Sequence, residues 1–337
     1  MPALCVMVGD GVGHEVVPAA VRVLRAVLPD LKTVSAEAGW DCFLKHGASV
    51  PTSTLQTIGE CGAGLFGAVS SPSHKVEGYR SAIVTMRQQL GLYANVRPIR
   101  ALPLAGARSD VNLLVVRENT EGLYIGRERQ EGPDCAIAER VITRDASRRI
   151  AHAAFELASG EERKTVTIVH KANVLPLTDG LFRQTVRQVA SDYPHLEVNE
   201  LLVDTAAMQL ARDPHRFDTI VTTNLFGDIL SDIATIWGGG MGLAPSLNLG
   251  DGIAVAEPVH GSAPDIAGQG IANPVATILS AALLLRHVWQ QPATATAVEQ
   301  AVFDTLAAGI HTPDIATKES QLVGTAGMTE AIISRLV

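Results

Sequence analysis

The feature that most constrains this chain is an alternation, from end to end, of short apolar runs with longer segments of helical period. Runs rich in Val, Leu and Ile predict buried strands, and apolar residues that recur every three or four positions predict amphipathic helices. Strands and helices that alternate in this way are typical of α/β proteins with a largely parallel sheet. The 337 residues, 47% of them hydrophobic, can bury a large core, and we expect two lobes.

The predicted elements cover most of the chain. Strands are expected at residues 4–8, 65–69, 111–116, 165–169 and 219–222. Helices are expected at residues 15–28, 82–90, 145–157, 180–191, 228–237, 274–289, 298–308 and 329–336. Residues 97–110, with two prolines and several small residues, are predicted to cross between lobes, and residues 248–253 to return. Residues 1–98 with 253–337 would then form a first lobe that holds both chain ends, and residues 99–252 a second lobe.

Charge and hydropathy exclude two classes of partner. The formal net charge is −8, the pI is near 5.7 and no local run of Lys or Arg occurs, so we expect no nucleic-acid binding. The longest apolar stretch, residues 275–285, is too short to cross a hydrocarbon core of about 30 Å. Residues 1–8 are apolar but lack a basic leader, so they predict a first strand. We therefore expect a cytoplasmic protein without a membrane span.

The four cysteines, Cys5, Cys42, Cys61 and Cys135, are scattered without any CxxC spacing. This pattern fits reduced thiols better than disulfides or a zinc site. Free cysteines are most often buried and inert, and we expect this of all four.

Three glycines, Gly9, Gly11 and Gly13, follow the first predicted strand and precede a predicted helix. This place is that of a dinucleotide-binding turn, but the spacing is GxGxG rather than GxGxxG. Three glycines serve equally well in a plain tight turn into a helix. The sequence leaves both interpretations open.

Two aspartates, Asp228 and Asp232, form a candidate metal site. Their i, i+4 spacing places both carboxylates on one face of the helix that follows the strand at residues 219–222. Open α/β sheets bind ligands at the carboxyl ends of strands, and hard divalent cations prefer clustered oxygen ligands. Asp204, which follows the apolar residues 201–203, is a candidate third ligand. Alternatively, Asp228 and Asp232 belong to a solvated helix face.

Three arginines, Arg87, Arg97 and Arg117, stand in apolar surroundings and must find anions, because an unpaired buried charge is costly. An internal Asp or Glu could be that anion, but three such arginines together suggest a substrate with two or more carboxylates. Lys171 follows the strand at residues 165–169 and is a candidate base, since lysines near other cations lose their proton more readily. Tyr124, which follows residues 117–123, is a second candidate for a functional side chain. A surface lysine and a core tyrosine are the alternatives.

Five segments of the sequence, in the same order along the chain, match the motifs of one known family: residues 9–15, 171–175, 224–232, 257–268 and 270–274. Together they resemble the β-decarboxylating dehydrogenases, the family of isocitrate, isopropylmalate and homoisocitrate dehydrogenases, over nearly the whole chain. The resemblance implies an isopropylmalate/isocitrate dehydrogenase-like α/β fold, with two α/β lobes that share a continuous mixed sheet. The first lobe would bind the cofactor, and the second would hold the dimer interface, the metal and the catalytic residues.

The resemblance also implies roles for individual residues. Tyr124 and Lys171 would be catalytic. The substrate would be bound by Ser71, Arg87, Arg97, Arg117, Tyr124, Lys171 and Asn173. Mg²⁺ or Mn²⁺ would be bound by Asp204, Asp228 and Asp232, with Asp204 and Lys171 contributed by the other subunit of a homodimer or dimer of dimers. NAD would be bound by His260, Gly261, Ser262, Ala263, Pro264, Asp265, Ile266 and Asn273.

The implied reaction oxidises a 2-hydroxy-3-carboxy acid and then releases CO₂. Lys171 would assist removal of the hydroxyl proton as hydride passes to NAD. The metal would polarise the new carbonyl, and Tyr124 would give the proton that completes the product.

The preference for NAD over NADP rests on Asp265 and Ile266. A carboxylate accepts a hydrogen bond from a ribose 2′-hydroxyl but repels a 2′-phosphate. NADP-linked relatives tend to have lysine and tyrosine at these two positions. Alternatively, Asp265 caps the turn into Ala267.

Substrate choice in the family depends on residues 70–87, which face the group on C3. Ser71, His74, Lys75 and Arg80 make this segment polar, whereas Val84 is apolar. Some homoisocitrate enzymes that also use isocitrate carry arginine in place of Val84. Residues 93–98 and 117–124 look more like homoisocitrate and NAD-linked isocitrate enzymes than like isopropylmalate enzymes. We favour homoisocitrate, and hence lysine synthesis through aminoadipate, with isocitrate or 3-isopropylmalate as alternatives.

A hypothesis of another class is a non-catalytic regulatory subunit that only binds ligands. Such a subunit would be expected to lack some of Tyr124, Lys171, Asp228 and Asp232. All four are present.

Overall fold

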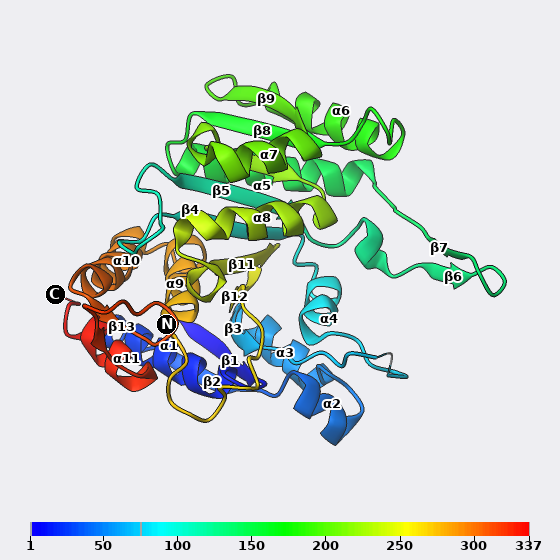
Figure 1. Cartoon of the computed structure of the whole chain (residues 1–337). Helices are drawn as coiled ribbons and strands as arrows, with labels where there is room; N and C mark the ends of the chain where they lie inside the picture. The colour runs from blue at the N-terminus through cyan, green and yellow to red at the C-terminus, as the bar shows by residue number, and fades with distance from the viewer. Residues whose placement is uncertain (1, 75, 337) are drawn as a thin grey trace. The chain divides into compact units, whose positions relative to one another are not determined.

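The computed structural model describes residues 2–74 and 76–336. The chain divides into two compact units. The first comprises Met1–Leu92, Ala101–Ser109 and Gly238–Val337, and the second comprises Tyr93–Arg100 and Asp110–Trp237. Figure 1 traces the elements of both units.

The first unit contains a five-stranded mixed sheet in the order β2-β1-β3-β12-β11. These strands are β1 (Ala3–Gly9), β2 (Lys32–Ser35), β3 (Ala63–Ala68), β11 (Pro245–Gly250) and β12 (Ile253–Pro258). Neighbouring strands run parallel except β11 and β12, which form an antiparallel pair. The two small strands β13 (Ile310–His311) and β14 (Gln321–Leu322) pair separately.

The helices of the first unit pack on both faces of this sheet (Figure 1). They are α1 (Gly13–Val27), α2 (Trp40–His46), α3 (Thr52–Cys61), α4 (Ala82–Gln89), α9 (Val275–Leu283), α10 (Pro292–Ala307) and α11 (Thr325–Ile333). Cys5, Met7 and Phe66 pack with Ile58 of α3 and Met86 of α4 on one face. Helix α1 contacts β1 and β3, and α9 contacts β11 and β12. A π-helical turn (Leu284–Val288) continues α9.

The second unit contains a mixed sheet in the order β4-β5-β10-β8-β9. Its strands are β4 (Ala94–Arg100), β5 (Asn112–Glu118), β8 (Thr165–His170), β9 (Glu197–Leu202) and β10 (Thr219–Thr222). All neighbours are parallel except the antiparallel pair of β4 and β5. The hairpin of β6 (Glu128–Gln130) and β7 (Ala136–Ala138) extends away from this sheet in Figure 1.

Four helices cover the sheet of the second unit: α5 (Arg144–Gly160), α6 (Thr178–Ala190), α7 (Val203–Arg212) and α8 (Asn224–Gly238). Leu113 and Val115 of β5 share a buried cluster with Leu210 of α7 and Leu230 of α8. Successive strand residues point to opposite faces, so the intervening residues of β5 face the other side of the sheet. Helix α5 contacts β5, β8 and β10. Because both faces are covered, the strands read as continuous apolar runs.

The glycine turn between β1 and α1 lies close to the backbone at Ser262. Gly9 and Gly11 have φ angles of +70° and +55°. A Cβ atom on Gly11 would lie 2.1 Å from the carbonyl oxygen of Ser262, which accepts a hydrogen bond from Val12 N at 2.9 Å. The tight-turn interpretation therefore holds, and the turn also contacts the segment predicted to bind the cofactor.

The predicted α/β class is confirmed, and every predicted strand and helix overlaps an observed one. Helices α2, α3 and α7 and strands β2, β4, β6, β7, β9, β11, β12, β13 and β14 were not predicted. The unit boundaries differ from those predicted near residues 98 and 253. Strand β4 pairs with β5, so residues 93–100 belong with the second unit, and β11 pairs with β12, so residues 245–250 belong with the first.

The four cysteines are free, but their surroundings differ. Cys5 and Cys42 are buried, and burial raises the pKa of the Cys5 thiol to about 12, which keeps it protonated and inert. Cys135 is exposed beside β7, so the prediction of burial was wrong there. Within residues 2–74 and 76–336, every helix is too short or too polar to span a bilayer.

Candidate active site

Two aspartates of α8 form the centre of the candidate site in the second unit. Helix α8 follows β10, as predicted, but it begins at Asn224, four residues earlier than expected. It carries Asp228 and Asp232 one turn apart on one face. Their side chains are 32% and 45% exposed, so both are accessible to a ligand. The alternative of a fully solvated helix face is wrong, because buried cations from β4 and β5 contact both carboxylates.

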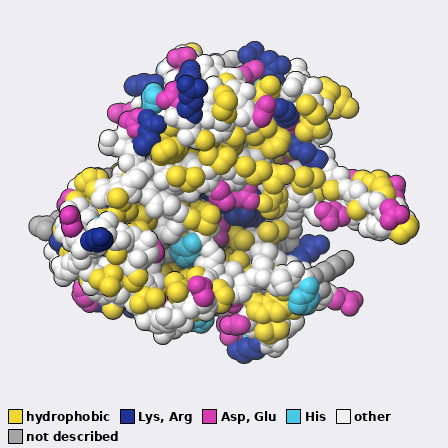
Figure 2. Space-filling view, viewed as in Figure 1, with side chains coloured by type: hydrophobic (Ala, Val, Ile, Leu, Met, Phe, Trp, Pro, Cys, Tyr) yellow, Lys and Arg dark blue, Asp and Glu magenta, His cyan; other side chains and the backbone are white. Residues whose placement is uncertain are grey.

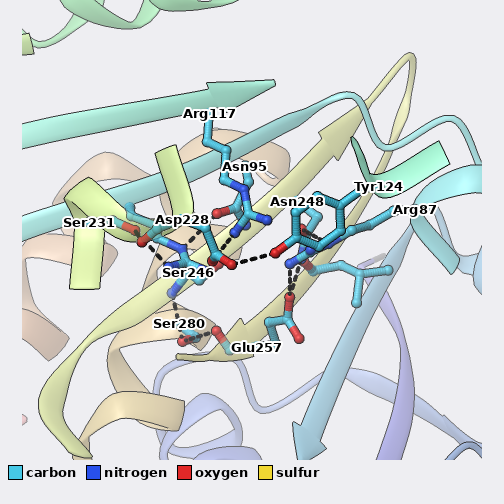
Figure 3. A network of polar contacts seen from close by, with 12 residues as sticks. Arg87, Asn95, Arg117, Tyr124, Asp228, Ser231, Ser246, Asn248, Glu257 and Ser280 are labelled. Carbon is cyan, nitrogen blue, oxygen red and sulfur yellow. Dashed lines mark hydrogen bonds and ion pairs between the residues drawn. The ribbon is translucent and has the colours of Figure 1, made fainter. Parts of the chain in front are cut away.

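Arg117 of β5 is the most deeply buried of these cations, with 1% of its surface exposed. It forms an ion pair with Asp228 and donates hydrogen bonds to Asn224 Oδ1 from Nε at 3.1 Å and from Nη2 at 2.7 Å. Its guanidinium carbon lies 5.1 Å from the centre of the Tyr124 ring. Figure 3 shows Arg117 pointing toward Asp228. The arginine therefore fixes the first turns of α8 against the sheet.

Arg97 of the neighbouring strand β4 is held by four oxygen acceptors. It donates to Asn95 Oδ1 and Ser231 Oγ, both at 2.7 Å, and to Asp232 Oδ1 at 3.1 Å. It also contacts Asp228 Oδ1 at 3.4 Å. Strands β4 and β5 thus present two guanidinium groups to the same pair of carboxylates.

Tyr124 belongs to a short 3₁₀ helix, Leu123–Ile125, that follows β5. Its hydroxyl donates a hydrogen bond of 2.6 Å to Asp228 Oδ2, drawn in Figure 3. Burial, and then this hydrogen bond, raise the pKa of the Tyr124 hydroxyl. Burial also raises the pKa of Asp232. The site therefore holds a protonated phenol, two carboxylates and two guanidinium groups on rigid elements.

Lys171 and Asp204 form a second polar pair in the same unit. Lys171 directly follows β8, as predicted, and its ammonium group forms an ion pair with Asp204 in the first turn of α7. The fully buried carboxylate of Asp179 accepts a hydrogen bond from Lys171 N at 2.6 Å and pairs with Arg140. Asn173, predicted to bind substrate, is exposed in the turn after Lys171.

Asp204 does not join Asp228 and Asp232 within one chain. Across the part of the chain that the structure describes, these three carboxylates do not approach closely enough to share an ion. Within one chain, the described residues therefore do not bring Asp204 to the pair on α8. The fit of Asp228 and Asp232 to a divalent cation rests on their donor chemistry, since both offer partly exposed carboxylate oxygens, which Mg²⁺ and Mn²⁺ prefer.

Arg87 belongs to the first unit and lies at the end of α4. It donates hydrogen bonds to Asn248 Oδ1 at 3.0 Å and to Glu257 Oε1 at 2.9 Å (Figure 3). Asn248 in turn donates to Glu257 at 2.8 Å. Each of the three predicted arginines thus has an internal carboxylate partner, as the alternative interpretation allowed. Glu257 and Asn248 were missed because they lie far away in sequence, on β12 and β11.

Asp10, in the glycine turn, was also missed as a functional residue. It is 2% exposed, and its carboxylate accepts hydrogen bonds from the backbone nitrogens of Trp40 at 2.8 Å, Asp41 at 3.0 Å and Ser70 at 2.7 Å. Ser70 Oγ donates to Ser262 Oγ at 2.8 Å. Asp10 therefore ties the start of α2 and the start of the predicted substrate segment to the glycine turn.

The segment after β3 keeps the polar character expected of it. Ser71, His74 and Arg80 are exposed, and Val84 is partly buried on α4. Lys75 lies outside the described residues. Residues 76–80 line a surface hollow of about 540 Å³.

The residues predicted to bind NAD lie at 260–266 and at 273, after β12. The His260 Nε2 atom is shielded from solvent and has no hydrogen-bond partner among the described residues, which fits a loop built to receive a polar ligand. Ala263 adopts a left-handed backbone with φ +37°. Asn273 is buried and donates to Asp314 Oδ2 at 3.1 Å. The Asp265 side chain is exposed, and Ile266 N donates to the Ala263 carbonyl, so no described contact shows Asp265 capping the turn.

Comparisons with known proteins agree with this arrangement. The family model for isocitrate/isopropylmalate dehydrogenase matches residues 3–332. An isocitrate/homoisocitrate dehydrogenase of Thermus thermophilus is 54% identical over 99% of this chain and 98% of its own length. A 3-isopropylmalate dehydrogenase of Methanothermobacter thermautotrophicus is 46% identical over 99% and 98%. The crystal structure of isocitrate dehydrogenase from Methylococcus capsulatus matches with a TM-score of 0.94 at 44% identity, over 100% of this chain and 99% of that one.

The fold and these matches define a dehydrogenase that decarboxylates a hydroxy acid. The chain belongs to the isocitrate/isopropylmalate dehydrogenase family.

We expect Mg²⁺ to bind Asp228 and Asp232 and thereby raise the unfolding temperature of the protein. A ligand that binds only the folded state raises the free energy of unfolding by about 2.7 kcal/mol when its concentration is 100 times its Kd. Asp232→Asn should lose most of this shift, because it removes one ligand charge. Asp251→Asn, in the exposed turn between β11 and β12, is the control and should keep the shift. Differential scanning calorimetry with and without Mg²⁺ measures it, and equal shifts in both variants would place the ion elsewhere.

Proposed function

We propose that this dehydrogenase oxidises homoisocitrate with NAD and releases CO₂, which yields 2-oxoadipate, the reaction of lysine synthesis through aminoadipate. The observation that carries the proposal is the cluster of Arg97, Arg117, Tyr124, Asp228 and Asp232 in a member of this family. It combines cations for substrate carboxylates, oxygen ligands for a divalent ion and a phenol that can donate a proton.

The choice of homoisocitrate among the family's substrates rests on the segment after β3. A homoisocitrate molecule carries a third carboxylate on its C3 substituent, whereas isopropylmalate carries a branched alkyl group there. Exposed Ser71, His74 and Arg80 suit a carboxylate better than an alkyl group. The 54% identical relative is named for both isocitrate and homoisocitrate, so isocitrate is the second candidate.

Arg97 and Arg117 are proposed to bind carboxylates of the substrate in the second unit. Guanidinium groups bind carboxylates through paired hydrogen bonds, and both arginines are already ordered by Asn95, Asn224 and neighbouring acidic groups. Little side-chain entropy is therefore lost when the substrate binds. Arg87 in the first unit is proposed to bind a further carboxylate.

Asp228 and Asp232 would hold a divalent cation, together with Asp204 of a second copy. Such an ion would supply Lewis acidity to the hydroxyl and carbonyl oxygens of the substrate. Residues 260–266 and Asn273 would hold NAD, which would supply the hydride acceptor for C2.

The chain's own groups would move the protons. Lys171 is proposed to take the proton of the substrate hydroxyl as the C2 hydrogen leaves as hydride. The bond between C3 and its carboxylate then breaks and CO₂ leaves. Its electrons form the C2–C3 double bond, while the carbonyl electrons move onto the C2 oxygen, which gives an enolate. Tyr124, whose raised pKa keeps its hydroxyl protonated, is proposed to deliver the proton to C3. The Asp179 carboxylate holds the Lys171 backbone by accepting a hydrogen bond from its nitrogen.

We further propose that the active site is shared between two copies of the chain. Large apolar side chains are exposed beside the predicted shared residues: Val174 and Leu177 follow Lys171, and Met208 lies one turn after Asp204. Ile229 and Ile236 are exposed on α8. Figure 2 shows hydrophobic side chains gathered over α7 and α8. Exposed apolar patches of this kind mark protein interfaces.

The substrate proposal predicts the highest kcat/KM for homoisocitrate, a lower value for isocitrate, and much lower values for 3-isopropylmalate and malate, which lack the third carboxylate. Exhaustive chelation should abolish turnover, and Mg²⁺ or Mn²⁺ should restore it. Steady-state NADH formation measures both. A higher kcat/KM for 3-isopropylmalate, or full turnover after chelation, would contradict the proposal.

The proposed division of proton transfer predicts that Tyr124→Phe lowers overall turnover by about 10²–10⁴-fold, the usual worth of a general acid. Reduction of 2-oxoadipate by NADH needs no proton at C3 and should be affected far less. Tyr193→Phe, a distant tyrosine that stacks on Phe155, is the control and should leave both rates unchanged. Equal losses in both reactions of Tyr124→Phe would mean that the residue only positions the substrate.

The proposed use of NAD predicts that Asp265→Lys with Ile266→Tyr shifts the ratio of kcat/KM toward NADP, because a cation replaces the carboxylate that would repel a 2′-phosphate. Asp251→Lys introduces the same charge at a remote exposed turn and should leave the ratio unchanged. The measurement is initial rate against each cofactor. If the wild-type protein uses NADP as well as or better than NAD, the role given to Asp265 is wrong.

A further inference from the structure

Three metal-binding side chains meet at the surface of the first unit, around helix α2. They are Glu37, Cys42 and His46. A carboxylate oxygen, the sulfur and a ring nitrogen of these residues all lie within 4.8 Å of one another. Cys42 and His46 are four residues apart on α2 and share one helical face. In the part of the chain that the structure describes, no other three His, Cys, Asp or Glu side chains come together in this way.

The backbone that carries these side chains is firmly held. The first turn of α2 donates two hydrogen bonds to the buried carboxylate of Asp10. Thr54 Oγ1 donates to the carbonyl oxygen of Glu37 at 2.8 Å, which fixes the residue that precedes the helix. The Trp40 and Phe43 rings of α2 also pack together, with ring centres 5.5 Å apart. A ligand set on fixed backbone loses little entropy when it binds an ion.

The donor atoms select the kind of ion. A thiolate sulfur, an imidazole nitrogen and a carboxylate oxygen together suit Zn²⁺ and similar transition metals, whereas Mg²⁺ prefers oxygen ligands alone. Glu37 and His46 also line an open surface hollow of about 460 Å³. This hollow leaves room for water as a fourth ligand.

We infer that Glu37, Cys42 and His46 form a Zn²⁺-class site with its fourth position open to solvent. The site is distinct from the paired aspartates of α8, and it does not depend on the proposed reaction, since none of its residues is assigned to substrate or NAD.

Charge balance explains how the same residues are stable without an ion. Lys45 Nζ and His46 Nε2 each lie 2.6 Å from a different oxygen of Glu37. The Lys45 side chain is 62% exposed, and exposed ion pairs contribute little, so it can turn into solvent when a metal takes its place. Lys45 therefore competes with the metal for Glu37.

The test is a titration of tag-free, metal-stripped protein with Co²⁺, which gives an intense charge-transfer band when a thiolate is a ligand. The wild-type protein and the Asp232→Asn variant should both show this band with one Co²⁺ per chain. Zn²⁺ should displace it, and excess Mg²⁺ should not. Cys42→Ser should lose the band, while the matched controls Cys61→Ser and Cys135→Ser should keep it.

Two affinity measurements sharpen the result. His46→Gln should weaken Co²⁺ binding at least about tenfold, because the loss of even an outer partner of a ligand weakens metal affinity by about that factor. Lys45→Met should strengthen binding, because it removes the competing ammonium group. A wild-type protein without the thiolate band, a band that survives in Cys42→Ser, or unchanged affinity in Lys45→Met would each overturn the site as proposed.

Discussion

The neutralisation of Arg117 is the interaction on which the second unit depends. A guanidinium group with 1% exposure must be paired, because breaking a buried ion pair from one side costs about 3–5 kcal/mol. Its partners Asp228 and Asn224 come from α8, and its face lies against the Tyr124 ring. One buried cation therefore sets the position of the strand, the helix and the 3₁₀ turn that carry the proposed chemistry. Precise placement of the reacting groups is a consequence of charge compensation.

The same rule operates in the first unit with different partners. Arg87 is neutralised by Glu257 on β12, and Asn248 of β11 binds both. Among residues 2–74 and 76–336 no cation pairs with Asp10, and three backbone N–H groups take that role. Such a carboxylate is stable because hydrogen bonds to its charged form offset the loss of water. In both units, charged groups that a ligand would meet are held in place before the ligand binds.

Local pattern accounts for the parts of the structure that could be predicted. The sequence predicts that β10 ends just before a helix and that Asp228 and Asp232 share one face of this helix. Both features depend only on residues that are near neighbours in the sequence. Strand β4 was missed because Arg97 and Pro98 interrupt its apolar run, and only antiparallel pairing with β5 makes it a strand. Proline is tolerated in such a strand where its nitrogen has no ladder partner.

The choice of ion-pair partners could not be predicted in the same way. The need of each arginine for an anion was evident, but Glu257 lies 170 residues from Arg87, and a single sequence does not show which distant carboxylate will approach. Asp10 was missed for the same reason, since the backbone donors to its carboxylate come from two distant segments, one at Trp40 and Asp41 and the other at Ser70.

The Glu37, Cys42 and His46 cluster shows a different limit, because its residues are neighbours in sequence. The absence of CxxC spacing argued against a zinc site. A cysteine and a histidine four residues apart on a helix, however, also share one face and can bind the same ion. The third donor, Glu37, becomes a neighbour only because the chain turns at Gly39, whose φ of +122° is strained for other residues.

The two groups of donors also differ in what they would exclude. The pair on α8 offers only oxygen ligands, so it would be a poor site for a soft metal. Two guanidinium groups lie beside it, so its affinity for any cation would rise when an anionic substrate neutralises the arginines. Sulfur and nitrogen at α2 would bind a borderline metal without such help. Under the two proposals, donor chemistry favours Mg²⁺ at α8 only in the presence of substrate, whereas α2 would bind a transition metal on its own.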